Sequence, residues 1–188
     1  NPYPSGYQKS LQVYYVDKSL LCEDSVNRKQ LQKLLLQNSS WPEMETKIDQ
    51  NPQEPQMLMI RVFQHNLPVA MVYVRNSGTE DKLGLYLRGN IKLAEQLDSL
   101  AKNVYRYLMI SFKNKKSLMA RAEKSILKSL IHDTGETIQL IEPEFEKVPL
   151  DRLINEMSSR QKLIEKVKGI WRITDLGRTL IKHSVNSE

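Results

Sequence analysis

Two apolar segments on either side of a short polar run constrain the fold of this 188-residue chain more than any other feature. Residues 70–74 and 83–87 are rich in leucine, β-branched and aromatic side chains, and this composition predicts two strands. The polar run between them, residues 75–82, carries an arginine, a serine, a glycine and a threonine. A guanidinium, two hydroxyls and a glycine amide are groups that bind phosphate. The run is therefore the first candidate binding site.

An ordinary hairpin loop is the alternative reading of this run, because serine, glycine and threonine are common in turns. The phosphate-binding reading is favoured by the arginine at one end, the Glu-Asp-Lys sequence at the other end and the strands on both sides. Gly78 has no Cβ, so the backbone can turn there and approach a ligand closely.

The sequence Arg75-Asn76-Ser77-Gly78-Thr79-Glu80 resembles the phosphate-binding loop of the α-D-phosphohexomutases, which include the phosphoglucomutases and phosphomannomutases. The order of elements expected over residues 24–109 is also similar to the last domain of that family. The resemblance implies a TBP-like C-terminal domain that binds a sugar phosphate. In the family, the equivalents of Arg75, Ser77, Gly78 and Thr79 hold the phosphate that is not transferred. Asn76, which replaces the usual proline, and Glu80 are expected to support the loop.

The same resemblance implies that this chain alone does not catalyse the mutase reaction. A phosphohexomutase needs a phosphoserine loop and an Asp-Gly-Asp-Gly-Asp-type loop that holds Mg²⁺, and neither motif occurs in the sequence. We therefore expect no catalytic residue, no metal ligand and no cofactor in this chain. The first residue is not methionine. We expect the chain to be the C-terminal piece of a larger protein, whose N-terminal domains would supply the Mg²⁺ site and the intramolecular phosphotransferase activity, if it is active.

The predicted fold class is α+β, with two domains. Residues 1–23 are expected to be an N-terminal connector, and residues 24–112 a small antiparallel sheet with packed helices. Helical spacing of apolar residues predicts helices at 25–37 and 91–112. Strands are predicted at 57–63 and 67–74, joined by a turn at 64–66, and the polar, proline-containing segment 38–56 is predicted to be a loop.

Residues 113–118 are predicted to be a linker, and residues 119–188 a mainly helical, winged-helix-like domain. Helices are expected at 119–131, 149–157 and 159–167, followed by an alternating segment and a closing helix. The run from Trp171 to Arg178 resembles the wing region of many winged-helix domains.

A cluster of basic residues in the second domain supports an alternative function. Between Ser158 and Ser184 there are seven Lys and Arg residues and two acidic residues, an excess of five positive charges. If residues 159–168 were a recognition helix and residues 171–175 a wing, several of these cations would contact a nucleic-acid backbone. The chain would then be a nucleic-acid-binding or regulatory protein with the mutase-like domain as a sensor. A merely solvated surface or a protein contact also remains open. The candidate residues are Arg160, Lys162, Lys166, Lys168, Arg172 and Arg178.

Composition adds three further expectations. The net charge of +6 permits an anionic partner without requiring one. A single cysteine predicts a reducing, cytoplasmic location. No apolar run approaches the roughly 20 residues needed to span a bilayer, so no membrane partner is expected.

Overall fold

The computed structural model describes residues 6–37, 44–132 and 134–185, with only the backbone of the last three. The chain divides into two compact units, residues 1–112 (unit 1) and 113–188 (unit 2). Unit 1 is a five-stranded antiparallel sheet with helices, and unit 2 is mainly helical with a two-stranded sheet. The predicted α+β class is confirmed. Among the residues that the structure describes, no helix is long and apolar enough to cross a membrane.

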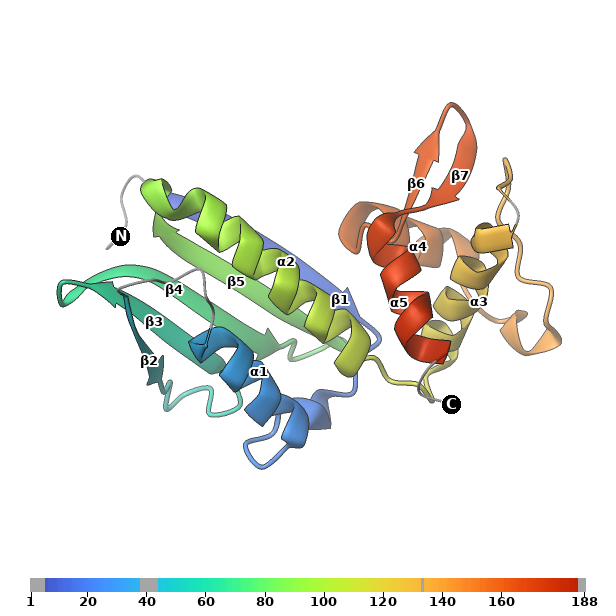
Figure 1. Ribbon diagram of the computed structural model, residues 1–188. Helices are drawn as coiled ribbons and strands as arrows, with labels where there is room; N and C mark the ends of the chain where they lie inside the picture. Colours follow the sequence, from blue (N-terminus) through green and yellow to red (C-terminus); the bar gives the residue numbers. More distant parts are fainter. Residues whose placement is uncertain (1–5, 38–43, 133, 186–188) are drawn as a thin grey trace. The chain divides into compact units, whose positions relative to one another are not determined.

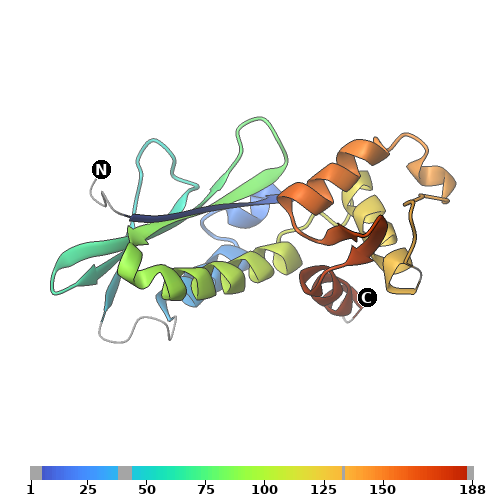
Figure 2. The same ribbon diagram turned by 90° about the horizontal axis from the view of Figure 1, so that it is seen from above.

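The sheet of unit 1 has the strand order β1-β5-β4-β3-β2, and helices α1 and α2 cover one of its faces (Figures 1 and 2). Short 3₁₀ turns precede each helix. The elements are β1 (Gly6–Tyr14), η1 (Lys18–Leu21), α1 (Val26–Leu36), β2 (Glu45–Asp49), β3 (Leu58–Gln64), β4 (Leu67–Asn76), β5 (Lys82–Asn90), η2 (Ile91–Leu93) and α2 (Ala94–Ser111).

Side chains alternate along the strands between the helix-covered face and the opposite face. In β4, Val72 and Val74 are buried, whereas Tyr73 is partly exposed and Arg75 exposed. The same alternation in β3 and β5, together with apolar side chains of α1 and α2, forms the core of unit 1. Residues of this core include Leu31, Leu35, Leu58, Ile60, Val62, Leu83, Leu85, Leu87, Leu97, Leu100, Val104 and Leu108.

The turn between β3 and β4 contains His65 and Asn66, both with positive φ (50° and 63°). This is the backbone of a two-residue hairpin turn, in which asparagine is well tolerated. The hairpin predicted here is confirmed. The predicted loop 38–56 is wrong in part, because β2 occupies Glu45–Asp49 and pairs with β3. Residues 38–43 of that predicted loop lie outside the described residues.

Residues 6–14 form an edge strand of the sheet and not the expected connector. β1 pairs along its whole length with β5, from Gly6 opposite Asn90 to Tyr14 opposite Lys82. Its Tyr7 hydroxyl and Lys9 ammonium both donate hydrogen bonds of 2.5 Å to the Asp98 carboxylate of α2. Sequence patterns are local, and β1 finds its partner about 75 residues away.

Asp98→Asn is expected to destabilise unit 1 at neutral pH and to have little effect in acid. Hydrogen bonds from Lys9 and then Tyr7 hold the pKa of Asp98 below its usual value. A lowered folded-state pKa contributes stability above the unfolded-state pKa, about 3.9, and this stability is lost as the pH falls through the folded-state value. The measurement is the free energy of unfolding of unit 1 in urea, followed by its NMR signals, for Asp98→Asn and wild type at pH 7 and pH 3. A difference between Asp98→Asn and wild type that is the same at both pH values would contradict the assignment.

The described residues of unit 2 form the α-helices α3, α4 and α5 and a β-hairpin (Figure 1). The carbonyl of Gly135, just after α3, accepts a hydrogen bond of 2.8 Å from Trp171 N–H, so this segment runs beside β7. The elements are α3 (Leu118–His132), η3 (Pro143–Phe145), α4 (Leu150–Asn155) with a π-helical continuation η4 (Glu156–Arg160), β6 (Ile164–Val167), β7 (Ile170–Ile173) and α5 (Asp175–Val185).

The predicted helix at 159–167 is wrong. The helical backbone ends at Arg160, and Lys162 and Lys168 have positive φ (58° and 51°) on either side of β6. Thr174 supplies a physical reason, because its hydroxyl donates to the Lys162 carbonyl (2.7 Å) and its N–H to the Leu163 carbonyl (3.0 Å). These long-range hydrogen bonds occupy carbonyls that a helix would use internally. The expected recognition helix is therefore absent from 159–168, and residues 171–173 of the expected wing form part of β7 in the β6–β7 hairpin.

The predicted linker at 113–118 is an ordered part of unit 2. The Lys113 side chain is only 10 % exposed, and its ammonium lies 2.6 Å from the Glu123 carboxylate of α3. Lys113 also donates to the Gln161 side-chain carbonyl (2.8 Å), and the Gln161 amide donates to Glu123 (2.6 Å). Three polar side chains thus satisfy one another inside the core of unit 2.

Candidate phosphate-binding loop and basic hairpin

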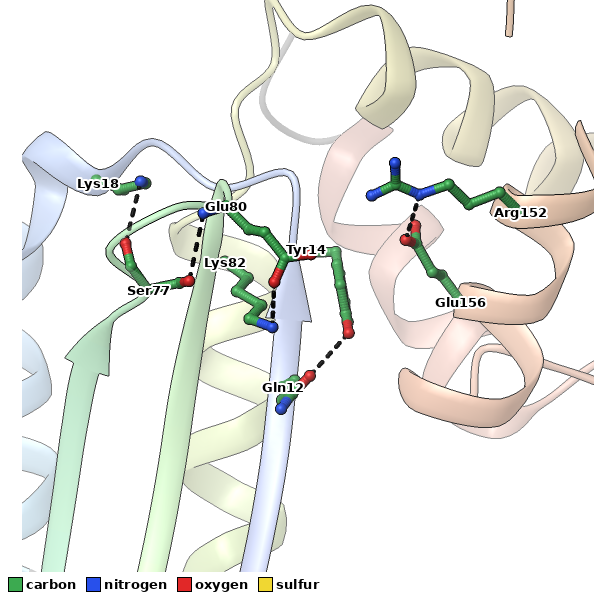
Figure 3. A network of polar contacts seen from close by, with 8 residues as sticks. All are labelled: Gln12, Tyr14, Lys18, Ser77, Glu80, Lys82, Arg152 and Glu156. Carbon is green, nitrogen blue, oxygen red and sulfur yellow. Dashed lines mark hydrogen bonds and ion pairs between the residues drawn. The ribbon is translucent and has the colours of Figure 1, made fainter. Parts of the chain in front are cut away.

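The candidate phosphate-binding loop joins β4 to β5, where the sequence pattern predicted it. The loop is closed by a hydrogen bond from Ser77 N–H to the Lys82 carbonyl (2.9 Å). Inside it, the Glu80 N–H donates to the Ser77 hydroxyl (3.3 Å), as Figure 3 shows. Gly78 and Thr79 are exposed, and nothing lies within 4 Å of the position that a Gly78 Cβ would occupy.

Several hydrogen-bond donors of this loop have no acceptor among the described residues. They are the N–H groups of Gly78 and Thr79, the Thr79 hydroxyl and the proton of the Ser77 hydroxyl. Consecutive backbone N–H groups in a bend form a concave site suited to an anion. The structure therefore brings together the hydroxyl and amide donors of Ser77, Gly78 and Thr79.

Arg75 lies at the end of β4, on the sheet face without helices. Its guanidinium lies 3.3 Å from the Glu54 carboxylate and 5.7 Å from the centroid of the Tyr86 ring. A hydrogen bond to Tyr86 and the nearby charge of Glu54 raise the pKa of Arg75. The Arg75 and Glu54 side chains are 47 % and 44 % exposed, so this pair lies at the surface.

Gly84 allows the Tyr86 ring to lie beside Arg75. Gly84 is opposite Arg75 in the sheet, and a Cβ at Gly84 would lie 2.7 Å from the Tyr86 hydroxyl oxygen. Tyr86 also stacks on Tyr73, with ring centroids 4.8 Å apart. The ring therefore occupies the space that a side chain at position 84 would need, which explains a glycine inside this strand.

Two lysines flank the loop (Figure 3), Lys82 at the end of the run selected from the sequence and Lys18 from outside that run. Lys18 donates to the Ser77 carbonyl (3.1 Å) and lies 3.6 Å from the Asp81 carboxylate. Lys82 forms an ion pair with Glu80, whose hydrogen bond raises the pKa of Lys82. The Glu80 carboxylate thus pairs with Lys82, while its amide supports the loop. Lys18 is 59 residues from Ser77 in the sequence, so no local pattern could place it here.

The six basic residues of the alternative site are distributed over the hairpin region of unit 2. All six are exposed, and none forms an ion pair with a carboxylate of the described residues. Arg160 ends η4, Lys166 and Lys168 lie on the hairpin, and the remaining three line one hollow at its base. Those three are Lys162, Arg172 and Arg178.

In comparisons with known proteins, no family model, no curated protein and no solved structure matches this chain.

Proposed function

We propose that the loop between β4 and β5 binds the phosphate group of a sugar phosphate. One observation supports this proposal: the N–H groups of Gly78 and Thr79 and the hydroxyls of Ser77 and Thr79 have no acceptor among the described residues, and the Lys18 ammonium contacts the same loop, 3.1 Å from the Ser77 carbonyl. Neutral donors in a bend with a cation beside them match a phosphate dianion, which accepts several hydrogen bonds at once.

Hydrogen bonds within unit 1 hold the loop in its conformation. The Ser77 N–H closes it against Lys82, and the Lys18 ammonium holds the Ser77 carbonyl from outside. Preorganisation lowers the entropic cost of binding, because the donors need not be fixed by the ligand. The proposed role is recognition: this chain would anchor a phosphate and leave phosphoryl transfer to other parts of a larger protein, which would also provide any Mg²⁺.

Glu54 competes with the ligand for Arg75. A surface ion pair between half-exposed side chains contributes only about 0–1 kcal/mol. Hydrogen bonds between a guanidinium and a phosphate are charge-assisted and often bidentate. The phosphate of a ligand would therefore replace the Glu54 carboxylate at modest cost.

A titration of the protein with glucose 1-phosphate tests the proposal. Binding is expected to shift the NMR amide signals of Ser77, Gly78 and Thr79 at millimolar ligand, with unphosphorylated glucose as the control. If the loop signals did not change at the highest soluble concentration of glucose 1-phosphate, the proposal would be contradicted.

Glu54→Gln is expected to increase the affinity for glucose 1-phosphate severalfold. The substitution removes both an acceptor that competes for Arg75 and a negative charge near the ligand. At an exposed site, the resulting gain in binding free energy is about 1 kcal/mol or less. Glu45→Gln is the matched control, because Glu45 also forms an exposed ion pair, with Lys47, but lies on β2. Isothermal titration calorimetry measures both variants. Equal affinities of Glu54→Gln and Glu45→Gln would contradict the competition.

A second candidate function is nucleic-acid binding by unit 2, with unit 1 as its sensor domain. The observation that favours it is the exposure of six cations that have no carboxylate partner among the described residues. Binding of duplex DNA is expected to weaken steeply with salt, as counterions are released. Charge reversal at Lys162, Lys166 and Arg172 that left DNA binding unchanged would exclude this function.

A further inference from the structure

A hollow at the base of the β6–β7 hairpin in unit 2 is not explained by the loop in unit 1. Its volume is about 790 Å³. Binding sites for small molecules commonly have volumes of about 300–1,000 Å³. Its lining comes from the segments around the hairpin and from the first turn of α5, and its charged members are Lys162, Glu165, Arg172, Asp175 and Arg178.

Three cations from three different parts of the chain line this hollow. Lys162 precedes β6, Arg172 lies on β7 and Arg178 lies on α5. Two acidic residues, Glu165 and Asp175, share the lining, so three positive and two negative charges leave a net charge of +1. Arg172 is directly opposite Glu165 in the hairpin, yet no ion pair joins them. The guanidinium of Arg172 is therefore available to a ligand.

The backbone around the hollow is held in place by close contacts. The Thr174 hydroxyl donates to the Lys162 carbonyl and accepts from Gly177 N–H (3.2 Å), which ties the start of α5 to the entry of β6. A Cβ at Gly177 would overlap the Leu163 carbonyl oxygen, so only glycine lets α5 approach this closely. Lys162 is kept in a left-handed conformation (φ 58°) by the same hydrogen bond from Thr174. The positions from which the three cations extend are thus preorganised.

We propose that this hollow is a second phosphate-binding site, in which Lys162, Arg172 and Arg178 hold one phosphate group. The two arginines provide planar forks that match phosphate oxygens, and the lysine adds a compact charge. The phosphate belongs either to a small phosphorylated molecule or to the backbone of a nucleic acid, because the recognising chemistry is the same. The site is in unit 2 and does not depend on the loop between β4 and β5.

The test compares two double variants that remove the same charge. Arg172→Gln/Arg178→Gln changes the lining of the hollow, whereas Lys128→Gln/Lys147→Gln changes exposed lysines of unit 2 that do not line it. Both are made in the full chain carrying Arg75→Ala, and the NMR amide signals of residues 172–178 report on this hollow alone. Dispersed unit 2 spectra show that each variant is folded. The probes are inorganic phosphate and a short DNA duplex.

The lining variant is expected to weaken binding of at least one probe by about tenfold or more, since charge-assisted hydrogen bonds are lost, and the control by about twofold or less. An effect seen with phosphate identifies a small phosphorylated ligand. An effect confined to the duplex identifies a backbone phosphate. The proposal is overturned if neither probe shifts residues 172–178, or if both double variants weaken binding equally, as a diffuse basic surface would.

Discussion

Arg75→Ala is expected to weaken glucose 1-phosphate binding by about tenfold to a hundredfold, because a hydrogen bond to a charged group contributes about 1.5–3 kcal/mol. Arg75→Lys is expected to lie between alanine and wild type, since lysine keeps the charge but loses the planar fork. Isothermal titration calorimetry measures the affinities. The fold is expected to persist, because the Arg75 side chain is 47 % exposed and its ion pair with Glu54 is at the surface.

Arg61→Ala is the matched control for this experiment. Arg61 lies on the neighbouring strand β3, its side chain is 50 % exposed and it forms an ion pair with Asp49 at 2.6 Å. Its environment is therefore similar to that of Arg75. Its position in the sheet differs, because Arg61 is opposite Met71. If Arg61→Ala weakened binding as much as Arg75→Ala, the effect of position 75 would be a general loss of positive charge and the loop would not be the site.

Glu123→Ala is expected to destabilise unit 2 by about 3–5 kcal/mol, because it removes the carboxylate that forms an ion pair with the buried Lys113 ammonium. Burial lowers the pKa of Lys113, although Glu123 acts in the opposite direction. A loss of this size approaches the whole stability of a small domain, about 5 kcal/mol or more. Thermal unfolding monitored by NMR signals of each unit is expected to show early melting of unit 2 alone.

Two comparisons distinguish a buried charge from a general effect of lost contacts. Arg121→Ala removes an ion pair with Glu144 whose two side chains are each 46 % exposed, and a cost of about 1 kcal/mol or less is expected. The triple variant Lys113→Met/Glu123→Met/Gln161→Leu replaces the whole buried network with apolar side chains, and it is expected to recover most of the stability. If Glu123→Ala cost no more than Arg121→Ala, the network would not be a desolvated ion pair.

Local patterns predicted those elements whose side chains follow a regular period. The strands on both sides of the loop, the turn at His65 and Asn66 and the helix ending near residue 112 have alternating or helical spacing in the sequence. Ser77, Gly78 and Thr79 could also be selected from the sequence, because they are consecutive residues and the two strands that flank them are adjacent in the chain. The partners Lys18, Glu54 and Tyr86 carried no such signal.

Local patterns misled where long-range hydrogen bonds determine the backbone. Residues 159–167 have helical spacing of apolar side chains, yet Thr174 binds the carbonyls of Lys162 and Leu163, and the segment becomes a turn and β6. The weak alternation of residues 11–16 suits either a short strand or a connector, and pairing with β5 makes residues 6–14 a strand.

The sequence by itself determined the α+β class and the loop between two strands, because period and turn chemistry are properties of neighbouring residues. Only the tertiary structure decided which charges are exposed and which are buried. Lys113 begins a basic run that looks solvated in the sequence, and it is enclosed with Glu123 and Gln161. Arg172 and Arg178 lie on different elements, and the fold brings them to one hollow. Burial and convergence depend on residues far apart in the chain, and for that reason no local pattern contains them.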